Sequence, residues 1–166
     1  MPKSPYDISP DASFVQAAQT SIRQQLHEML SHLHGTRAGD DPEALHDMRV
    51  ASRRLRAALS VFSQVYPQKT FAPLEKQVAR VTDALGAVRD ADVQIEFMMG
   101  RRDAAPESAR VGLDAFIDTL TKERDAERVH LVKALDALEK SRFRRDFDDL
   151  LAAADAVVTP EAAPHG

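Results

Sequence analysis

The chain has 166 residues, of which 43% are hydrophobic and only 5% aromatic, a composition that favours a single helical domain over a β protein. It contains no cysteine, which excludes disulfides, thiolate metal sites and cysteine nucleophiles. Its formal net charge of -4 argues against indiscriminate binding to DNA, and no stretch resembles a signal peptide or a membrane span. We therefore expect a cytoplasmic protein that does not bind membranes.

Apolar residues recur at helical spacing and predict four main helices. The first is expected to begin near Asp11 or Ser13, either of which can act as an N-cap, and to end at Gly35. The second is expected to begin at Asp41-Pro42, an acceptor side chain followed by a ring that fixes φ near its helical value. It should continue to Tyr66-Pro67, where the second proline stops it.

The second half of the chain continues this pattern. A third helix is expected from about Pro73, with a break or kink near Gly86, where helix propensity weakens. A fourth is expected from about Pro106 to Lys140, and a shorter amphipathic segment over 143–158 should pack behind it. The predicted fold is all-α, an antiparallel four-helix bundle with a short additional C-terminal helix.

One domain is expected, because no linker is long enough to separate two. The bundle is assigned to residues 13–158. Prolines and small residues predict a flexible N-terminus over 1–12 and a flexible tail over 159–166.

One face of the second predicted helix is basic. On a wheel of about 100° per residue, an arc of roughly 80° holds four basic side chains, namely His46, Arg49, Arg53 and Arg56. The arginines have no acidic partner at matching positions of the same helix, and the planar guanidinium group suits phosphate oxygens. The stripe therefore predicts a surface for a polyanion, with an ordinary solvated face as the alternative. Arg54 is about 100° from Arg53 on the wheel and is a more peripheral cation.

Cations on other predicted helices extend this hypothesis. Arg124 and Arg128 interrupt the apolar seam of the fourth helix. They either turn outward to pair with acidic residues or face a basic cavity beside the second helix. Lys76 and Arg80, one turn apart, either complete that cavity or form an ordinary solvated pair.

Catalytic and metal-binding patterns are missing from the sequence. The six histidines include no pair at the four-residue spacing that places two imidazoles on one helical face, so no metal site and no cofactor are expected. There is no phosphate-binding glycine loop and no serine elbow, so we expect a protein that is not an enzyme. Asp90 and Asp92 do not form an evident acid and base pair, and Asp90 is expected to orient a nearby arginine instead.

Two sequence motifs carry a family resemblance. LHDMRVASRRLRAALSVF over 45–62 and LGAVRDADV over 85–93 match, in order and spacing, the CHAD family, the conserved histidine α-helical domain. The resemblance implies a non-catalytic domain that binds inorganic polyphosphate and targets or scaffolds proteins at polyphosphate granules. By motif position it assigns the basic face and the second signature to these residues: His46, Arg49, Arg53, Arg56, Arg89 and Asp90.

The chain departs from the family pattern in length. Full CHAD domains resemble two four-helix bundles around a basic groove, each with its own His and Arg helix, whereas this chain has one such helix. We therefore expect a homodimer in which a second copy supplies the missing bundle.

Other functions stay open. A nucleic-acid or other phosphorylated-ligand binding module is disfavoured by the acidic net charge and the few aromatic residues. An accessory role in polyphosphate or triphosphate hydrolysis is a further alternative. The last is a structural adaptor whose arginines pair with acidic protein partners, granule-associated proteins among them.

Overall fold

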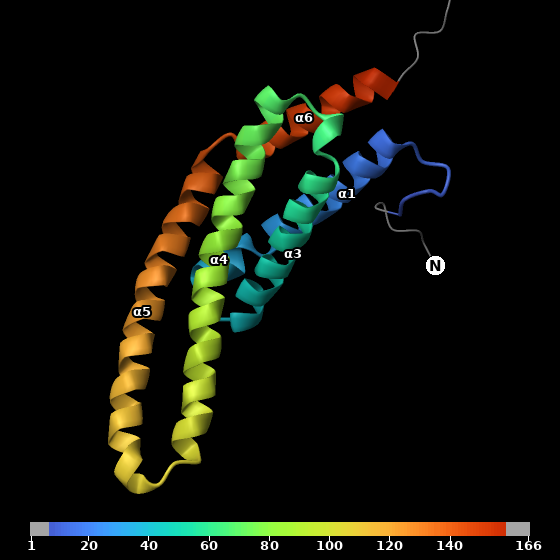
Figure 1. Ribbon diagram of the computed structural model, residues 1–166. Coiled ribbons are helices and arrows are strands. Elements are labelled where there is room, and N and C mark those ends of the chain that lie inside the picture. The colour runs from blue at the N-terminus through green and yellow to red at the C-terminus, as the bar shows by residue number, and fades with distance from the viewer. Residues whose placement is uncertain (1–6, 159–166) are drawn as a thin grey trace, which may run out of the picture.

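The computed structural model describes residues 7–158, with side chains up to Ala154, and within this range its regular secondary structure consists of helices alone (Figure 1). The elements are α1 (Phe14–Ser31), α2 (Leu33–Ala38), α3 (Pro42–Val61), the 3-10 turn η1 (Ser63–Val65), α4 (Gln68–Asp103), α5 (Glu107–Lys140) and α6 (Phe143–Val158). The predicted all-α class is therefore confirmed. The tail over 159–166 and the first six residues lie outside the described part of the chain.

Local capping signals set the starts of α1 and α3. Ser13 is the N-cap of α1 and forms a capping box, in which the Gln16 amide donates to the Ser13 Oγ at 3.2 Å and the Ser13 amide donates to the Gln16 Oε1 at 2.9 Å. Asp41 is the N-cap of α3, where its carboxylate accepts from the Glu43 amide at 2.9 Å, and Pro42 follows as the first helical residue. Both predicted starts are confirmed, but α3 ends at Val61 instead of continuing to Tyr66-Pro67, and the turn η1 follows it.

The predicted end of the first helix is wrong. α1 ends at Ser31, and Gly35 lies inside the short helix α2, whose C-cap is Gly39 with a left-handed φ of 77°. A Cβ on Gly35 would lie 3.0 Å from the Cβ of Ala44. The glycine therefore permits the close approach of α2 to α3 rather than stopping a helix.

The third predicted helix differs from the structure at two points. α4 begins at Gln68 rather than near Pro73, and it continues without a break through Gly86. Burial explains the continuity, because Leu85 and Val88 on either side of the glycine are 0% and 2% exposed. Packing of this kind outweighs the cost of about 1 kcal/mol that a glycine adds to a helix interior.

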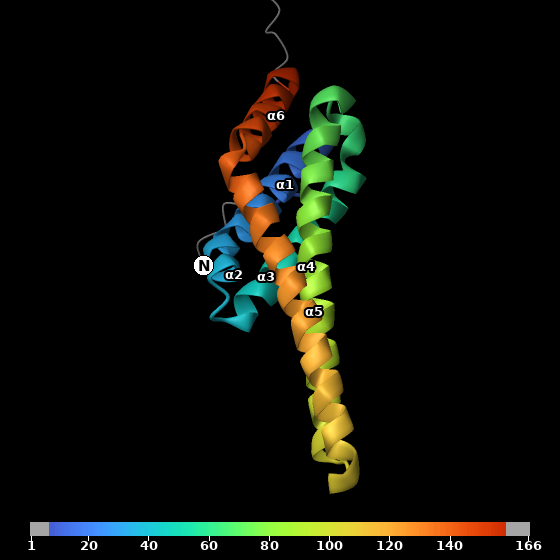
Figure 2. The same cartoon turned by 90° about the vertical axis from the view of Figure 1, so that its left-hand side faces the viewer.

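The helices pack mainly in three pairs. α3 lies against α1 on one side and α4 on the other, while α4 pairs with α5 along its length. α6 packs along α1, where the Gln19 Nε2 donates to the Leu151 carbonyl at 2.9 Å, and against the first turns of α4 (Figures 1 and 2). The fourth predicted helix and the C-terminal segment are confirmed as α5 and α6, whereas closure into an antiparallel four-helix bundle stays a prediction.

The α4–α5 hairpin extends well past the other helices (Figures 1 and 2). In α4 the last buried residue is Val88, and in α5 the first is Leu120, so no residue over 89–119 is buried. We call residues 89–119 the distal hairpin. Several of its large hydrophobic side chains are exposed, namely Val93, Phe97, Met99, Val111 and Phe116. No helix in the described range is long and apolar enough to cross a lipid bilayer.

Candidate anion-binding groove

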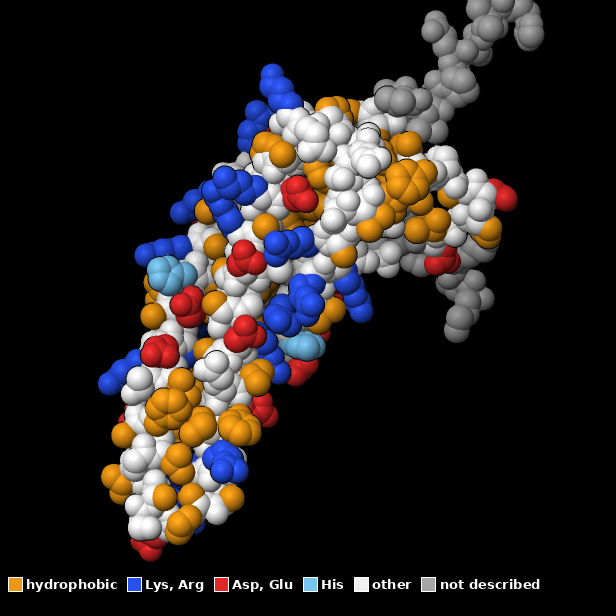
Figure 3. Space-filling view, in the orientation of Figure 1, with side chains coloured by type: hydrophobic (Ala, Val, Ile, Leu, Met, Phe, Trp, Pro, Cys, Tyr) orange, Lys and Arg blue, Asp and Glu red, His pale blue; other side chains and the backbone are white. Residues whose placement is uncertain are grey.

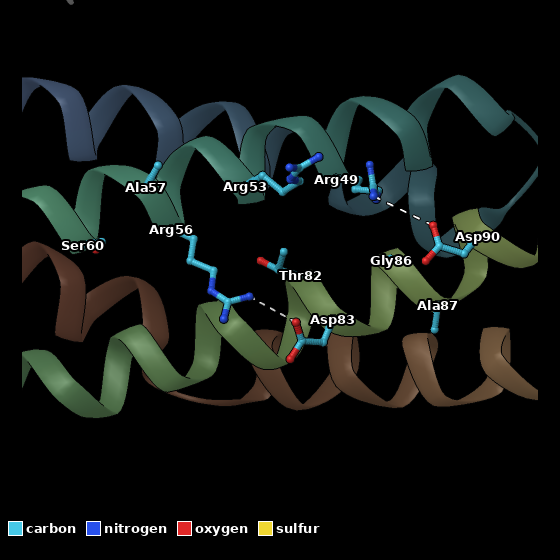
Figure 4. A pocket seen from close by; sticks show the side chains of 10 residues that line it. All are labelled: Arg49, Arg53, Arg56, Ala57, Ser60, Thr82, Asp83, Gly86, Ala87 and Asp90. Carbon is cyan, nitrogen blue, oxygen red and sulfur yellow. Dashed lines mark hydrogen bonds and ion pairs between the residues drawn. The ribbon is translucent and has the colours of Figure 1, made fainter.

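A groove of about 580 Å³ lies between α3 and α4 (Figure 4). We call it the α3–α4 groove. The wall from α3 consists of Arg49, Arg53, Arg56, Ala57 and Ser60, and the wall from α4 consists of Thr82, Asp83, Gly86, Ala87 and Asp90. Three of the four stripe residues predicted from the sequence thus line one groove.

The amphipathic pattern of α3 sets this arrangement. Met48, Leu55 and Leu59 are fully buried in the core. Because arginines at steps of four and three residues occupy a neighbouring arc of the same helix, burial of the apolar arc turns them toward α4. Gly86 faces them without a side chain, and an added Cβ there would meet no atom within 4 Å, so the groove is open above it.

Two of the three arginines interact with carboxylates across the groove. The Arg56 Nη1 donates to the Asp83 Oδ1 at 3.2 Å. The Arg49 Nη2 is 4.0 Å from the Asp90 Oδ1, beyond hydrogen-bonding distance, so the predicted role of Asp90 in orienting an arginine stays a prediction. Both aspartates are mostly exposed, at 72% and 71%, so each pair contributes about 0–1 kcal/mol to stability.

Arg53 is the arginine in the middle of the stripe, and it has no hydrogen-bond or ion-pair partner among the residues that the structure describes. Its side chain is exposed. The groove thus holds three guanidinium groups against two carboxylates, with the central cation free to meet an anion.

His46 and Arg54 are not among the residues that line this groove. His46 is half-buried on α3, one turn before Arg49, and Arg54 is exposed on another face of the helix. The structure therefore separates Arg54 from the stripe, as the helical wheel predicted, and brings His46 beside the groove rather than into it.

Arg89, Arg124 and Arg128 line a different cavity, of about 430 Å³, together with Asp41, Glu43, Asp92 and Glu96. The Arg124 Nε lies 3.3 Å from the Asp125 Oδ1 and 3.7 Å from the Asp92 Oδ1. These cations do not converge on the α3–α4 groove. Of the two arrangements predicted for Arg124, the structure shows the one in which it pairs with acidic residues.

Arg128 has a structural contact across the fold. Its Nη2 donates to the backbone oxygens of Thr36 at 3.2 Å and Arg37 at 2.8 Å, which are carbonyls of the last turn of α2. A cation at a helix C-terminus interacts favourably with the helix dipole. The guanidinium lies so close to Gly39 that a Cβ there would collide with it.

Lys76 and Arg80 are exposed on α4 and line a third groove, of about 430 Å³, between α4 and α5. α4 separates this groove from the stripe, so the two residues do not complete a single basin with Arg53. Sequence reasoning also missed Asp83, Thr82 and Gly86 as groove residues. These residues and Asp90 recur at helical steps and therefore share one face of α4. That pattern could have identified the second wall of the groove only if the alignment of α3 against α4 had been known.

Comparison with known proteins gives a family match. A family model described as the CHAD domain matches residues 20–165. Two curated relatives from Mycobacterium tuberculosis, strains H37Rv and CDC 1551, are described as uncharacterized proteins and are 30% and 29% identical over 144 residues. These alignments cover 86% of this chain but 26% of each relative, so the chain spans about a quarter of their length. No solved structure matches.

Proposed function

The chain belongs to the CHAD domain family, and we propose that it binds inorganic polyphosphate in the α3–α4 groove without hydrolysing it. The family is associated with polyphosphate-related proteins. The observation that carries the proposal is the row of three arginines on one wall, of which the central one, Arg53, has no acidic partner among the described residues.

The chemistry of the groove suits a flexible chain of phosphates. Each guanidinium group can donate two parallel hydrogen bonds to phosphate oxygens. Arg49 and Arg56 are held by exposed carboxylates that contribute little, so phosphate can replace Asp90 and Asp83 at small cost. Binding should weaken steeply with salt, by analogy with counterion release from single-stranded nucleic acids.

Two consequences belong to the same proposal. A domain that binds polyphosphate without turnover would hold its protein at polyphosphate granules in the cytoplasm, as a targeting or scaffolding unit. Granule-associated proteins would then be its neighbours. Expression of a fluorescent fusion in cells with and without polyphosphate would test this, since localisation at granules should require the polymer.

The central test is a salt series with long-chain polyphosphate. Arg49→Glu with Arg53→Glu should abolish binding at moderate salt, because it reverses two charges inside the groove. Lys69→Glu with Lys122→Glu is the matched control, since both lysines are exposed, line none of the grooves described above, and change the net charge equally. Equal affinities of the two double variants would refute the proposal.

Competition and turnover assays separate the alternatives. Unlabelled DNA and RNA should displace polyphosphate poorly, because the groove lining includes no aromatic side chain on which bases could stack. Incubation with polyphosphate and magnesium or manganese should release no phosphate. Displacement by nucleic acid at equal phosphate concentration, or steady phosphate release, would favour a rival function.

We also propose that the chain forms a homodimer through the distal hairpin. On α4 the groove residues Gly86 and Asp90 are followed at steps of three and four by Val93, Phe97 and Arg101. The same face therefore passes from the groove to an exposed apolar strip with an acid at one end and a base at the other.

A second copy fits this strip by charge. An antiparallel two-fold pairing of α4 helices sets Val93 opposite Phe97 of the partner, and it brings Asp90 near Arg101 of the partner at both ends. Arg101 is exposed and has no partner among the described residues. Light scattering should show a dimer that Phe97→Asp converts to a monomer. A wild-type monomer, free and with polyphosphate, would refute this pairing.

A further inference from the structure

A second basic cavity, of about 310 Å³, lies where α5 turns into α6. We call it the α5–α6 pocket. Its polar lining is His34, Glu139, Ser141, Arg142, Arg144 and Arg145, and its apolar lining is Leu30, Leu33, Leu138 and Phe143. None of these arginines belongs to the stripe on α3 or to the motif around Arg89.

The acidic residues around this pocket are already engaged. Glu139 accepts a short contact of 2.6 Å from the Arg37 Nη1. Asp146 lies 3.8 Å from Arg142, a loose pair with a guanidinium that is 67% exposed. Arg144 and Arg145 are exposed and have no hydrogen-bond or ion-pair partner within the described residues. The pocket therefore has two guanidinium groups that no carboxylate of the described residues neutralises.

The backbone adds to the positive potential. α6 begins at Phe143, whose amide donates to the Ser141 Oγ at 3.2 Å. In the first turn of a helix the amides have no intrahelical acceptor, and the helix dipole favours negative charge there. The Phe143 amide is already engaged by Ser141, and the Asp146 amide donates to the Arg142 carbonyl at 2.8 Å, so the arginines provide the hydrogen bonds for an anion and the helix dipole adds to their attraction.

The α5–α6 pocket adjoins, at the C-terminal end of α5, the groove between α4 and α5. It shares Leu138 and Ser141 with the groove that Lys76 and Arg80 line. Arg80 is one helical turn from Asp83, which lines the α3–α4 groove. Figure 3 shows Lys and Arg side chains along the α3–α4 seam and again over the upper ends of α4 and α5.

We propose that the α5–α6 pocket is a second anion-binding site that takes a later segment of the same phosphate chain, after the chain has crossed α4 beside Arg80 and Lys76 and passed the end of α5 at Ser141. This inference rests on the proposed function, because it assigns the pocket to polyphosphate. A short oligophosphate fills one site only. A long chain fills both, so its affinity rises through the high effective concentration of the second segment.

The test compares tripolyphosphate with long-chain polyphosphate on the full chain. Arg144→Glu with Arg145→Glu should weaken long-chain binding at least about tenfold, since it removes the tethered contact, and should leave tripolyphosphate affinity at the α3–α4 groove unchanged. The salt dependence of long-chain binding should also become less steep, because fewer phosphates are neutralised. Lys69→Glu with Lys122→Glu again controls for net charge.

The outcomes separate this inference from the proposed function. If the wild-type chain binds neither ligand, the proposed function fails. If Arg49→Glu with Arg53→Glu abolishes binding while Arg144→Glu with Arg145→Glu behaves as the lysine control, the second site is refuted and the first stands. Equal losses for both ligands would also refute two separate sites. Arg144→Gln with Arg145→Gln, checked by thermal unfolding, should reproduce the long-chain loss in a folded protein.

Discussion

Removal of the two groove carboxylates should strengthen polyphosphate binding. Asp83 and Asp90 lie opposite the arginines and repel any phosphate that enters. Each takes part in an exposed ion pair of about 0–1 kcal/mol, so Asp83→Asn with Asp90→Asn should recover at most about 2 kcal/mol for the ligand. Since about 1.4 kcal/mol is a factor of ten, we expect affinity to rise between a few-fold and about thirtyfold.

The two aspartates should contribute unequally. Asp83 is hydrogen-bonded to Arg56 at 3.2 Å, whereas Asp90 lies 4.0 Å from Arg49, so Asp83→Asn releases the more strongly held guanidinium. Fluorescence anisotropy with labelled polyphosphate at fixed salt measures both single variants and the double variant. The unfolding free energy should change by no more than about 1 kcal/mol per site. Weaker binding in the double variant would refute this reasoning and would make the carboxylates positioning groups for the arginines.

Three further predictions concern stability and titration. Gly86→Ala should raise the free energy of unfolding in urea by up to about 1 kcal/mol, because the added Cβ meets no atom and removes a helix-interior glycine; destabilisation would show that the groove floor is tighter than described. Gly39→Ala should lower it by at least about 1–2 kcal/mol, because the residue has a left-handed φ and the Cβ would displace Arg128, and an unchanged unfolding midpoint would contradict this. The Arg102 guanidinium donates to Asp114 and holds the pKa of that carboxyl below its usual range. The pair therefore stabilises the hairpin at pH values above the ordinary pKa of aspartate, and this contribution is lost as the pH falls through the lowered pKa. NMR titration should show that Arg102→Gln raises the pKa of Asp114 toward its usual value.

The sequence predicted best those features that depend on neighbouring residues. The N-caps at Ser13 and Asp41 and the segment that became α6 follow from signals within a few positions, because capping and amphipathic spacing are local. The predicted break at Gly86 failed for the opposite reason. Propensity is a weak term, and burial of Leu85 against distant helices decided the outcome.

The candidate site was predictable on one wall only. A wheel drawn on α3 brings Arg49, Arg53 and Arg56 together without any tertiary information. The opposite wall depends on how α3 and α4 align, which periodicity does not reveal. The carbonyl acceptors of Arg128 belong to residues 91 and 92 positions away in the sequence. No local pattern could therefore distinguish its capping contact from a ligand site.

The distal hairpin should be locally less stable than the rest of the molecule. Without a buried residue over 89–119, this segment has little to resist local opening, while the base of α4 is anchored by Leu85 and Val88. Backbone amides should therefore exchange with solvent much faster at the hairpin tip than beside the groove. A partner that covers Val93 and Phe97 would slow that exchange. Protection of these amides from exchange would therefore report association directly, and binding of the partner would stabilise the tip of the hairpin against local opening.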